Sequence, residues 1–149
     1  MKAADMFNLT GRVALVTGAS SGLGQQFARA LADNGASVAL VARRTDRLLD
    51  LQQEIEAKGG KALAIEADVT DRAAMIAAYD AAEKAFGPVT ILVNNAGVAQ
   101  QSIRVTDVAP EEWRRVLSVD LDAVFYWAQE AARRMIAAKV PGAIVNIAS

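Results

Sequence analysis

The 149-residue sequence has 53% hydrophobic and 22% charged residues, a balance typical of one globular domain. Its net charge of −1 and the lack of a basic stripe argue against nucleic-acid binding. Cysteine and histidine are both absent, which excludes disulfides, serine–histidine catalysis and most transition-metal sites. We therefore expect no metal site.

The first residues do not resemble a targeting segment. Residues 1–10 carry charges at Lys2 and Asp5 and lack the apolar core of a signal peptide. No apolar run reaches the roughly 18 residues that a membrane span needs. We therefore expect a cytoplasmic protein without a membrane partner.

Strand and helix patterns alternate along the chain. Short apolar runs predict strands over residues 12–17, 37–41, 62–66, 89–93 and 143–147. Helical spacing predicts helices over residues 21–34, 45–58 and 72–86, a short helix beginning at Pro110, and a separate helix over 121–139. This alternation predicts an α/β fold, a Rossmann-type doubly wound parallel sheet in three α/β/α layers, with strand order 3-2-1-4-5. A ligand crevice is then expected at the carboxyl ends of the first and fourth strands.

A glycine-rich turn follows the first predicted strand. Its glycines have the spacing G-x-x-x-G-x-G, and a helix follows whose apolar face is expected at Leu23, Phe27, Ala30 and Leu31. The first amides of a helix lack internal partners, and glycines let a phosphate approach them. The turn therefore predicts a site for the diphosphate of a dinucleotide, formed by Gly18, Ser20, Ser21, Gly22, Leu23 and Gly24.

Two arginines stand at the end of the second predicted strand. A site for NAD places a carboxylate there to bind the ribose hydroxyl, but Ala42 occupies that position and Arg43 and Arg44 follow it. A guanidinium can instead pair with the extra phosphate of NADP. The sequence therefore favours NADP(H) over NAD(H), the alternative being that both arginines are a solvated strand end.

Polar and small residues follow the third and fourth predicted strands. Asp68 can accept a hydrogen bond from an adenine amino group while Val69 packs on the ring, or Asp68 can be a turn or capping residue. After the fourth strand, Asn94 is expected to have a structural role. Cofactor contact is expected for the three residues that follow it, Asn95, Ala96 and Gly97.

Together these motifs resemble the short-chain dehydrogenase/reductase family. Residues 17–24 look like its TGxxxGxG fingerprint, residues 94–97 like its NNAG motif, and residues 68–69 like its adenine-side aspartate. The resemblance covers the whole chain and is greatest to the single-domain alcohol and carbonyl reductases. It implies hydride transfer between a nicotinamide cofactor and a small-molecule substrate, interconverting a secondary alcohol and a ketone.

The same resemblance implies two catalytic residues. Ser149 falls on the family's serine that hydrogen-bonds the substrate carbonyl. Asp120 stands where the family usually has an asparagine that supports a proton-relay water. A carboxylate can also hold a water, but the alternative for Asp120 is a cap between two helices.

The family's Tyr-x-x-x-Lys pair does not occur among these residues. Tyr79 and Tyr126 are each followed four residues later by a glutamate. A tyrosine needs a nearby ammonium to act as a base at neutral pH. We therefore expect residues 1–149 to be the N-terminal part of a longer enzyme and to be inactive alone. The alternative is a non-catalytic dinucleotide-binding module that acts as a sensor or scaffold.

The predicted helix over residues 121–139 has a wide apolar surface. Part of this surface must pack on the sheet. The rest is expected to form a homodimer or homotetramer contact, as the family resemblance also implies.

Overall fold

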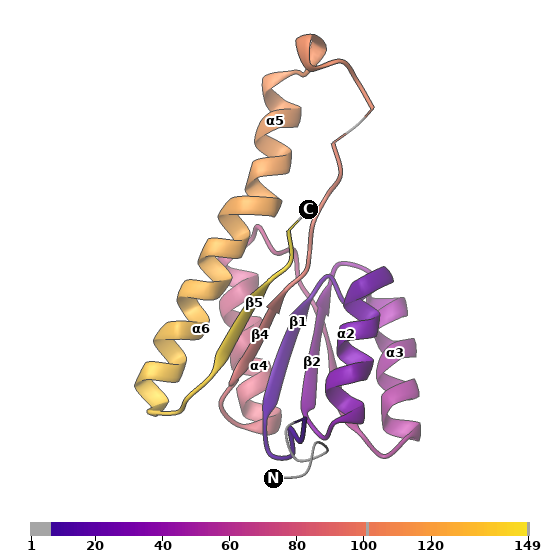
Figure 1. The fold of residues 1–149 in the computed structure, drawn as a ribbon, viewed down its shortest axis with the longest axis vertical. Helices are drawn as coiled ribbons and strands as arrows, with labels where there is room; N and C mark the ends of the chain where they lie inside the picture. Colours follow the sequence, from indigo (N-terminus) through magenta and orange to yellow (C-terminus); the bar gives the residue numbers. More distant parts are fainter. Residues whose placement is uncertain (1–6, 101, 149) are drawn as a thin grey trace.

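The computed structural model describes residues 7–100 and 102–148. Within these ranges there are five strands: β1 (Val13–Thr17), β2 (Ser37–Ala42), β3 (Lys61–Glu66), β4 (Ile91–Asn94) and β5 (Ala143–Asn146). The α-helices are α2 (Gly22–Asp33), α3 (Thr45–Ala57), α4 (Arg72–Phe86), α5 (Pro110–Leu117) and α6 (Val124–Ala138). A short η1 (Val105–Asp107) precedes α5, and η2 (Ser118–Ala123) joins α5 to α6 (Figure 1).

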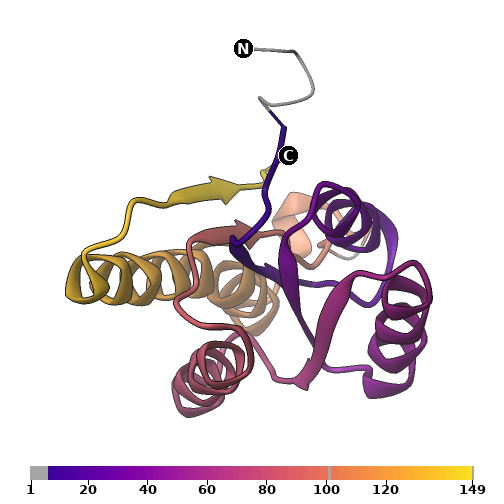
Figure 2. The ribbon, with the colours of Figure 1, turned by 90° about the horizontal axis from the view of Figure 1, so that it is seen from below.

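All described strands form one parallel sheet in the order β3-β2-β1-β4-β5. The predicted fold class and strand order are therefore confirmed. Figure 2 shows the sheet between two helical layers, with α2 and α3 on one face and α4 and α6 on the other. Each layer encloses its own hydrophobic cluster.

Strand β1 explains why this sheet is buried on both faces. Its residues alternate between the two clusters, with Leu15 on the α4–α6 side and Ala14 and Val16 on the α2–α3 side, and all are almost fully buried. Because both faces are covered, the strand reads as a continuous apolar run and not as an alternating one. That run is what made the strand predictable.

The predicted apolar face of helix α2 is wrong in part. Leu23 is 61% exposed and Ala30 is also exposed, whereas Gly24, Ala28 and Ala32 face the core. Small side chains let the helix axis approach β1 and β2 closely. Larger residues are therefore displaced to the flanks of the contact, a consequence that helical spacing alone does not reveal.

The two C-terminal helices are joined, contrary to the separate helices predicted. Residues 110–138 form one helical segment in which Ser118–Ala123 is a π-helical turn. No glycine or proline interrupts residues 111–138, so nothing ends the helix there. Asp120 lies inside this π turn and does not cap α6, because no side chain caps that helix.

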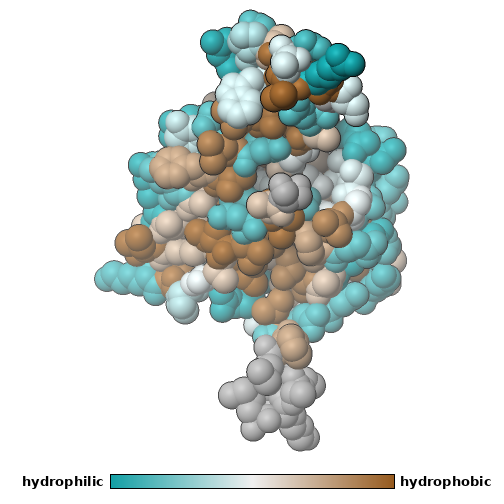
Figure 3. All heavy atoms as spheres, turned by 45° about the horizontal axis from the view of Figure 1, so that its top comes forward, coloured by the Kyte–Doolittle hydropathy of each residue, from teal (hydrophilic) through white to brown (hydrophobic). Residues whose placement is uncertain are grey.

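The side of the sheet at β5 is more open than the rest. All four β5 residues are exposed, and apolar side chains of β5 and α6 reach the surface, among them Val145 and Ile136. Figure 3 shows hydrophobic atoms gathered on this part of the molecule. Among the described residues, no helix has the length and apolar character needed to cross a membrane.

Candidate cofactor-binding site

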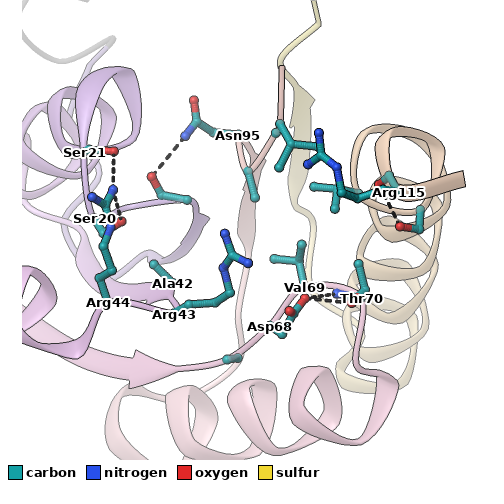
Figure 4. Close-up of a pocket in the computed structure, with 17 residues that line it drawn as sticks. Ser20, Ser21, Ala42, Arg43, Arg44, Asp68, Val69, Thr70, Asn95 and Arg115 are labelled. Carbon is teal, nitrogen blue, oxygen red and sulfur yellow. Dashed lines mark hydrogen bonds between the residues drawn. The ribbon is translucent and has the colours of Figure 1, made fainter. Parts of the chain in front are cut away.

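A cavity of about 750 Å³ lies at the carboxyl ends of the strands, where the strand order reverses (Figure 4). Its volume is in the range of small-molecule and cofactor sites. Ten residues predicted from the sequence line it: Gly18, Ser20, Ser21, Arg43, Arg44, Asp68, Val69, Asn95, Ala96 and Gly97. Seven further lining residues were not predicted as site residues: Ala42, Ala67, Thr70, Val98, Arg115, Ser118 and Val119.

The glycine turn is built by backbone geometry that side chains disfavour. Gly18 and Gly22 have φ angles of +67° and +57°, in the left-handed region. Gly24 is required for packing, because a Cβ added there would collide with the carbonyl oxygen of Gly18. Of the predicted turn residues, Gly22, Leu23 and Gly24 are not among those that line the cavity.

The start of helix α2 has no side-chain cap. Ser21 occupies the N-cap position, but its hydroxyl makes no capping hydrogen bond. The hydroxyls of Ser20 and Ser21 instead accept hydrogen bonds from Nη2 of Arg44, at 3.2 and 2.9 Å. The helix dipole therefore presents partial positive charge at the cavity, with a guanidinium beside it.

The end of strand β2 supplies positive charge to the same cavity. Ala42 is 7% exposed, and exposed Arg43 and Arg44 follow it. In Figure 4, Arg44 reaches across to the two serines, while Arg43 points into the cavity. No carboxylate stands at the strand end where a ribose hydroxyl would require one.

Asp68 forms a tight turn in the cavity wall, directly after the neighbouring strand β3. Its Oδ1 accepts hydrogen bonds from the backbone N–H and the hydroxyl of Thr70, at 2.9 and 2.7 Å. These bonds, aided by the positive charge of Arg43, lower the pKa of Asp68 below its usual value. The turn interpretation of Asp68 is thus correct, and its carboxylate faces the cavity as well. The helix cap is Asp71, which accepts hydrogen bonds from the amides of Ala73 and Ala74.

A buried hydroxyl ties the end of β4 to the glycine turn. Oγ1 of Thr17 accepts hydrogen bonds from the amides of Asn95 and Ala96, at 3.0 and 3.1 Å. The Asn95 side-chain amide donates to the carbonyl oxygens of Thr17 and Gly18. Asn94 is structural, since its amide donates to Val124 on α6 and to Asn146 on β5. These contacts fix the two strand ends that flank the cavity.

The helical segment after β4 holds the loop that leaves the cavity. Oδ1 of Asp120 accepts a hydrogen bond from the amide of Val98 at 2.9 Å. Nη2 of Arg115 donates to the carbonyl oxygen of Ala99 at 3.0 Å. Asp120 therefore contacts the loop beside the site, in place of the capping role considered above. The other predicted catalytic residue, Ser149, lies outside the described residues.

Neither tyrosine belongs to the cavity lining. Tyr79 is fully buried between α4 and α6, and its hydroxyl donates to the carbonyl oxygen of Trp127. This burial raises the pKa of Tyr79 far above its ordinary value. The ring of Tyr126 lies 4.3 Å from the guanidinium carbon of Arg72. Neither tyrosine hydroxyl is therefore available to a ligand in the cavity.

The sequence matches the family model for short chain dehydrogenase over residues 12–149. With the parallel sheet and the glycine turn in place, this match shows that the chain belongs to the short-chain dehydrogenase family. Gluconate 5-dehydrogenase of Gluconobacter oxydans (strain 621H) is 42% identical over 145 residues, covering 97% of this chain and 56% of that enzyme. The chain thus spans about half the length of this relative.

Two solved structures have the same fold. A short-chain type dehydrogenase/reductase from Mycobacterium marinum is 39% identical, with a TM-score of 0.95 over 100% of this chain and 60% of that one. A metagenomic short-chain oxidoreductase, solved in complex with NADP, is 40% identical, with a TM-score of 0.88 over 95% of this chain and 63% of that one. The fold described here is therefore that of the family's oxidoreductases.

Proposed function

We propose that this chain binds NADP(H) in preference to NAD(H) and belongs to an enzyme that interconverts a secondary alcohol and a ketone. The observation that carries the cofactor preference is the end of β2, where Arg43 and Arg44 line the cavity and Ala42 stands in place of a carboxylate. A guanidinium pairs with a phosphate through charge-assisted hydrogen bonds. The metagenomic relative solved with NADP supports the same preference.

The residues around the cavity fit a dinucleotide along its length. The uncapped start of α2, with Ser20, Ser21, Gly22, Leu23 and Gly24, would hold the diphosphate. Asp68 and Val69 would hold the adenine, as the family resemblance implies. Asn95, Ala96 and Gly97 would place the other half of the cofactor at the end of β4. A nicotinamide held there would supply or accept the hydride.

The catalytic part of the proposal draws on Asp120 and on Ser149, which lies outside the described residues. Ser149 would hydrogen-bond the carbonyl oxygen of the substrate and orient it. Asp120 would contribute by holding the amide of Val98, and with it the loop beside the reacting groups. We propose that residues 1–149 are the dinucleotide-binding part of a longer enzyme, a view that the partial coverage of its relatives supports. Gluconate 5-dehydrogenase supports a hydroxylated small molecule as the substrate class.

A second candidate function is a non-catalytic dinucleotide sensor or scaffold. It is favoured by the two tyrosines, which lie away from the cavity and precede glutamates instead of lysines. The two functions are distinguished by following NADPH absorbance when the full-length protein meets a panel of small ketones. Turnover above the protein-free rate would exclude the non-catalytic function, and binding without turnover would favour it.

The cofactor preference is tested by the dissociation constants of NADPH and NADH in the full-length protein. We expect NADPH to bind more tightly, and Arg44→Ala to reduce this preference about tenfold because a charge-assisted pair is lost. Arg47→Ala is the matched control, since Arg47 is exposed on α3 and does not line the cavity. Equal affinities for both nucleotides in the unmodified protein would contradict the proposal.

We further propose that the helix over residues 121–139 forms a contact between copies of the full-length protein. Its support is the exposure of large apolar side chains, namely Leu121 at 58%, Phe125 at 58% and Ile136 at 76%. Sedimentation velocity of the full-length protein tests it. A dimer or tetramer is expected, and a monomer at micromolar concentration would contradict the proposal.

A further inference from the structure

A buried tryptophan from helix α6 reaches the loop that follows strand β3. Trp127 has no exposed surface, and its Nε1–H donates a hydrogen bond to the carbonyl oxygen of Val69 at 2.9 Å. Val69 lines the cavity together with its neighbours Asp68 and Thr70. The indole thus contacts the backbone of the cavity wall from behind.

The loop is held from three directions. On the β2 side, the amide of Ala67 donates to the carbonyl oxygen of Ala42 at 3.0 Å. Within the loop, Asp68 accepts both hydrogen bonds from Thr70. On the α6 side, the contact is the one from Trp127. The first contact ties the loop to β2 and the second lies within the loop, so neither fixes the distance between the loop and α6. The hydrogen bond from the indole therefore sets that distance.

The indole is itself fixed by its surroundings. The hydroxyl of Tyr79 donates to the carbonyl oxygen of Trp127 at 2.9 Å, and the two rings lie 5.5 Å apart. Arg134 lies 5.2 Å from the Tyr79 ring and pairs with Glu83 on α4 and Glu130 on α6. Such a packed and paired arrangement leaves a side chain little rotameric freedom.

We propose that Trp127 is a positioning residue for the adenine half of the dinucleotide. Its N–H holds the carbonyl of Val69 and so places Asp68 and Val69 at the distance from the glycine turn that the nucleotide requires. The proposal rests on the proposed function, because it takes the cavity to be a dinucleotide site. It predicts that loss of the indole N–H weakens binding of the adenine half while leaving the nicotinamide half unaffected.

The sharpest test removes the N–H and keeps the shape. In the full-length protein, Trp127 is replaced by benzothienylalanine, in which sulfur takes the place of the indole N–H. Tyr79→Phe is the matched control, because it removes the buried hydrogen bond to the backbone carbonyl of Trp127 but keeps both the aromatic ring that packs against the indole and the indole N–H itself. Affinities are measured by calorimetry for AMP, which carries the adenine half, and for nicotinamide mononucleotide. Hydrogen exchange of the Thr70 amide is measured without nucleotide.

We expect the Trp127 replacement to weaken AMP binding about fivefold, as for one lost hydrogen bond, and to speed exchange at Thr70. Tyr79→Phe should leave both unchanged, and neither variant should alter binding of nicotinamide mononucleotide. Equal AMP affinities in the unmodified and Trp127-replaced proteins would overturn the positioning role. An equal loss in the Tyr79→Phe control would overturn it too, by showing a general structural effect. No binding of AMP or NADPH by the unmodified protein would instead overturn the proposed function, and the ligand assignment with it.

Discussion

Helices α2 and α4 both begin at the same edge of the sheet, but their first turns are built differently. At α4, the carboxylate of Asp71 accepts hydrogen bonds from the amides of Ala73 and Ala74. At α2, the Ser21 hydroxyl makes no capping bond and accepts one from Arg44 instead. The first amides of α4 donate to a side chain at the helix start. The first amides of α2 have no such acceptor and lie at a cavity that Arg43 and Arg44 also line.

Under the proposed function, this difference separates a helix start that serves stability from one that is available for binding. A capping side chain contributes roughly 1 kcal/mol to the stability of a helix. An uncapped start gives up that contribution and gains an anion site, provided that glycines allow the anion to approach. Adding a side-chain cap to α2, removing the cap of α4, or disturbing the glycine turn should therefore change stability and binding separately.

The largest effect is expected where the glycine turn packs against α2. Gly24→Ala places a methyl group against the carbonyl of Gly18 and within 2.6 Å of the Asn95 amide nitrogen. Because a backbone carbonyl cannot move aside cheaply, we expect a loss of about 2–3 kcal/mol in the free energy of unfolding. Gly59→Ala is the control. A Cβ at Gly59 would meet open space, so its only cost comes from the left-handed backbone conformation of that residue. Urea denaturation compares the two, and equal losses would show that the close packing at Gly24 is unimportant.

Giving α2 the cap of α4 should separate binding from stability. Ser21→Asp puts a carboxylate at the N-cap, where it can accept from the first amides and repel a diphosphate. We expect NADPH affinity to fall at least about tenfold while the fold becomes no less stable. Calorimetry and thermal melting measure the two quantities. Undiminished affinity would mean that the diphosphate binds elsewhere.

Removing the cap of α4 is the reverse experiment. Asp71→Ala leaves the amides of Ala73 and Ala74 without their acceptor. We expect a loss of about 1 kcal/mol in the free energy of unfolding and no change in NADPH affinity. A drop in affinity comparable to that in Ser21→Asp would show that the two helix starts do not differ in function.

The smallest expected effect is a pH dependence that involves Asp68. Its hydrogen bonds from Thr70 lower its pKa in the folded state, so the unfolded state binds more protons near pH 4. Asp68 therefore stabilises the fold above its unfolded pKa, and this contribution is lost as the pH falls through the folded pKa. When the pH is lowered from about 5 to about 3, the free energy of unfolding should therefore fall less in Asp68→Asn than in the unmodified protein. Denaturation series at each pH measure this. Parallel pH profiles would contradict this assignment.

The sheet and the glycine turn could be predicted because their signals are local. Buried parallel strands such as β1 give continuous apolar runs, and the turn carries glycines at fixed spacing between a strand and a helix. The arginines after β2 were predictable for the same reason, since their position relative to the strand end is fixed by sequence.

What could not be predicted depends on distant contacts. The buried face of α2 follows from how closely Ala28 and Ala32 approach the sheet, which helical spacing does not encode. The π turn around Asp120 depends on packing of α5 and α6, since it has no glycine or proline to mark it. The contact of Trp127 with Val69 joins residues 58 positions apart, and Trp127 gave no signal beyond that of a core residue.

The most direct test of the central claim follows backbone amide resonances by NMR while NADPH is added to the full-length protein. The uncapped start of α2 should respond, so we predict large shifts for Ser21, Gly22 and Leu23. The resonances of Ala73 and Ala74 should not shift, because their amides already donate hydrogen bonds to the carboxylate of Asp71. Equal shifts at both helix starts, or none at α2 while NADPH binds, would contradict the account.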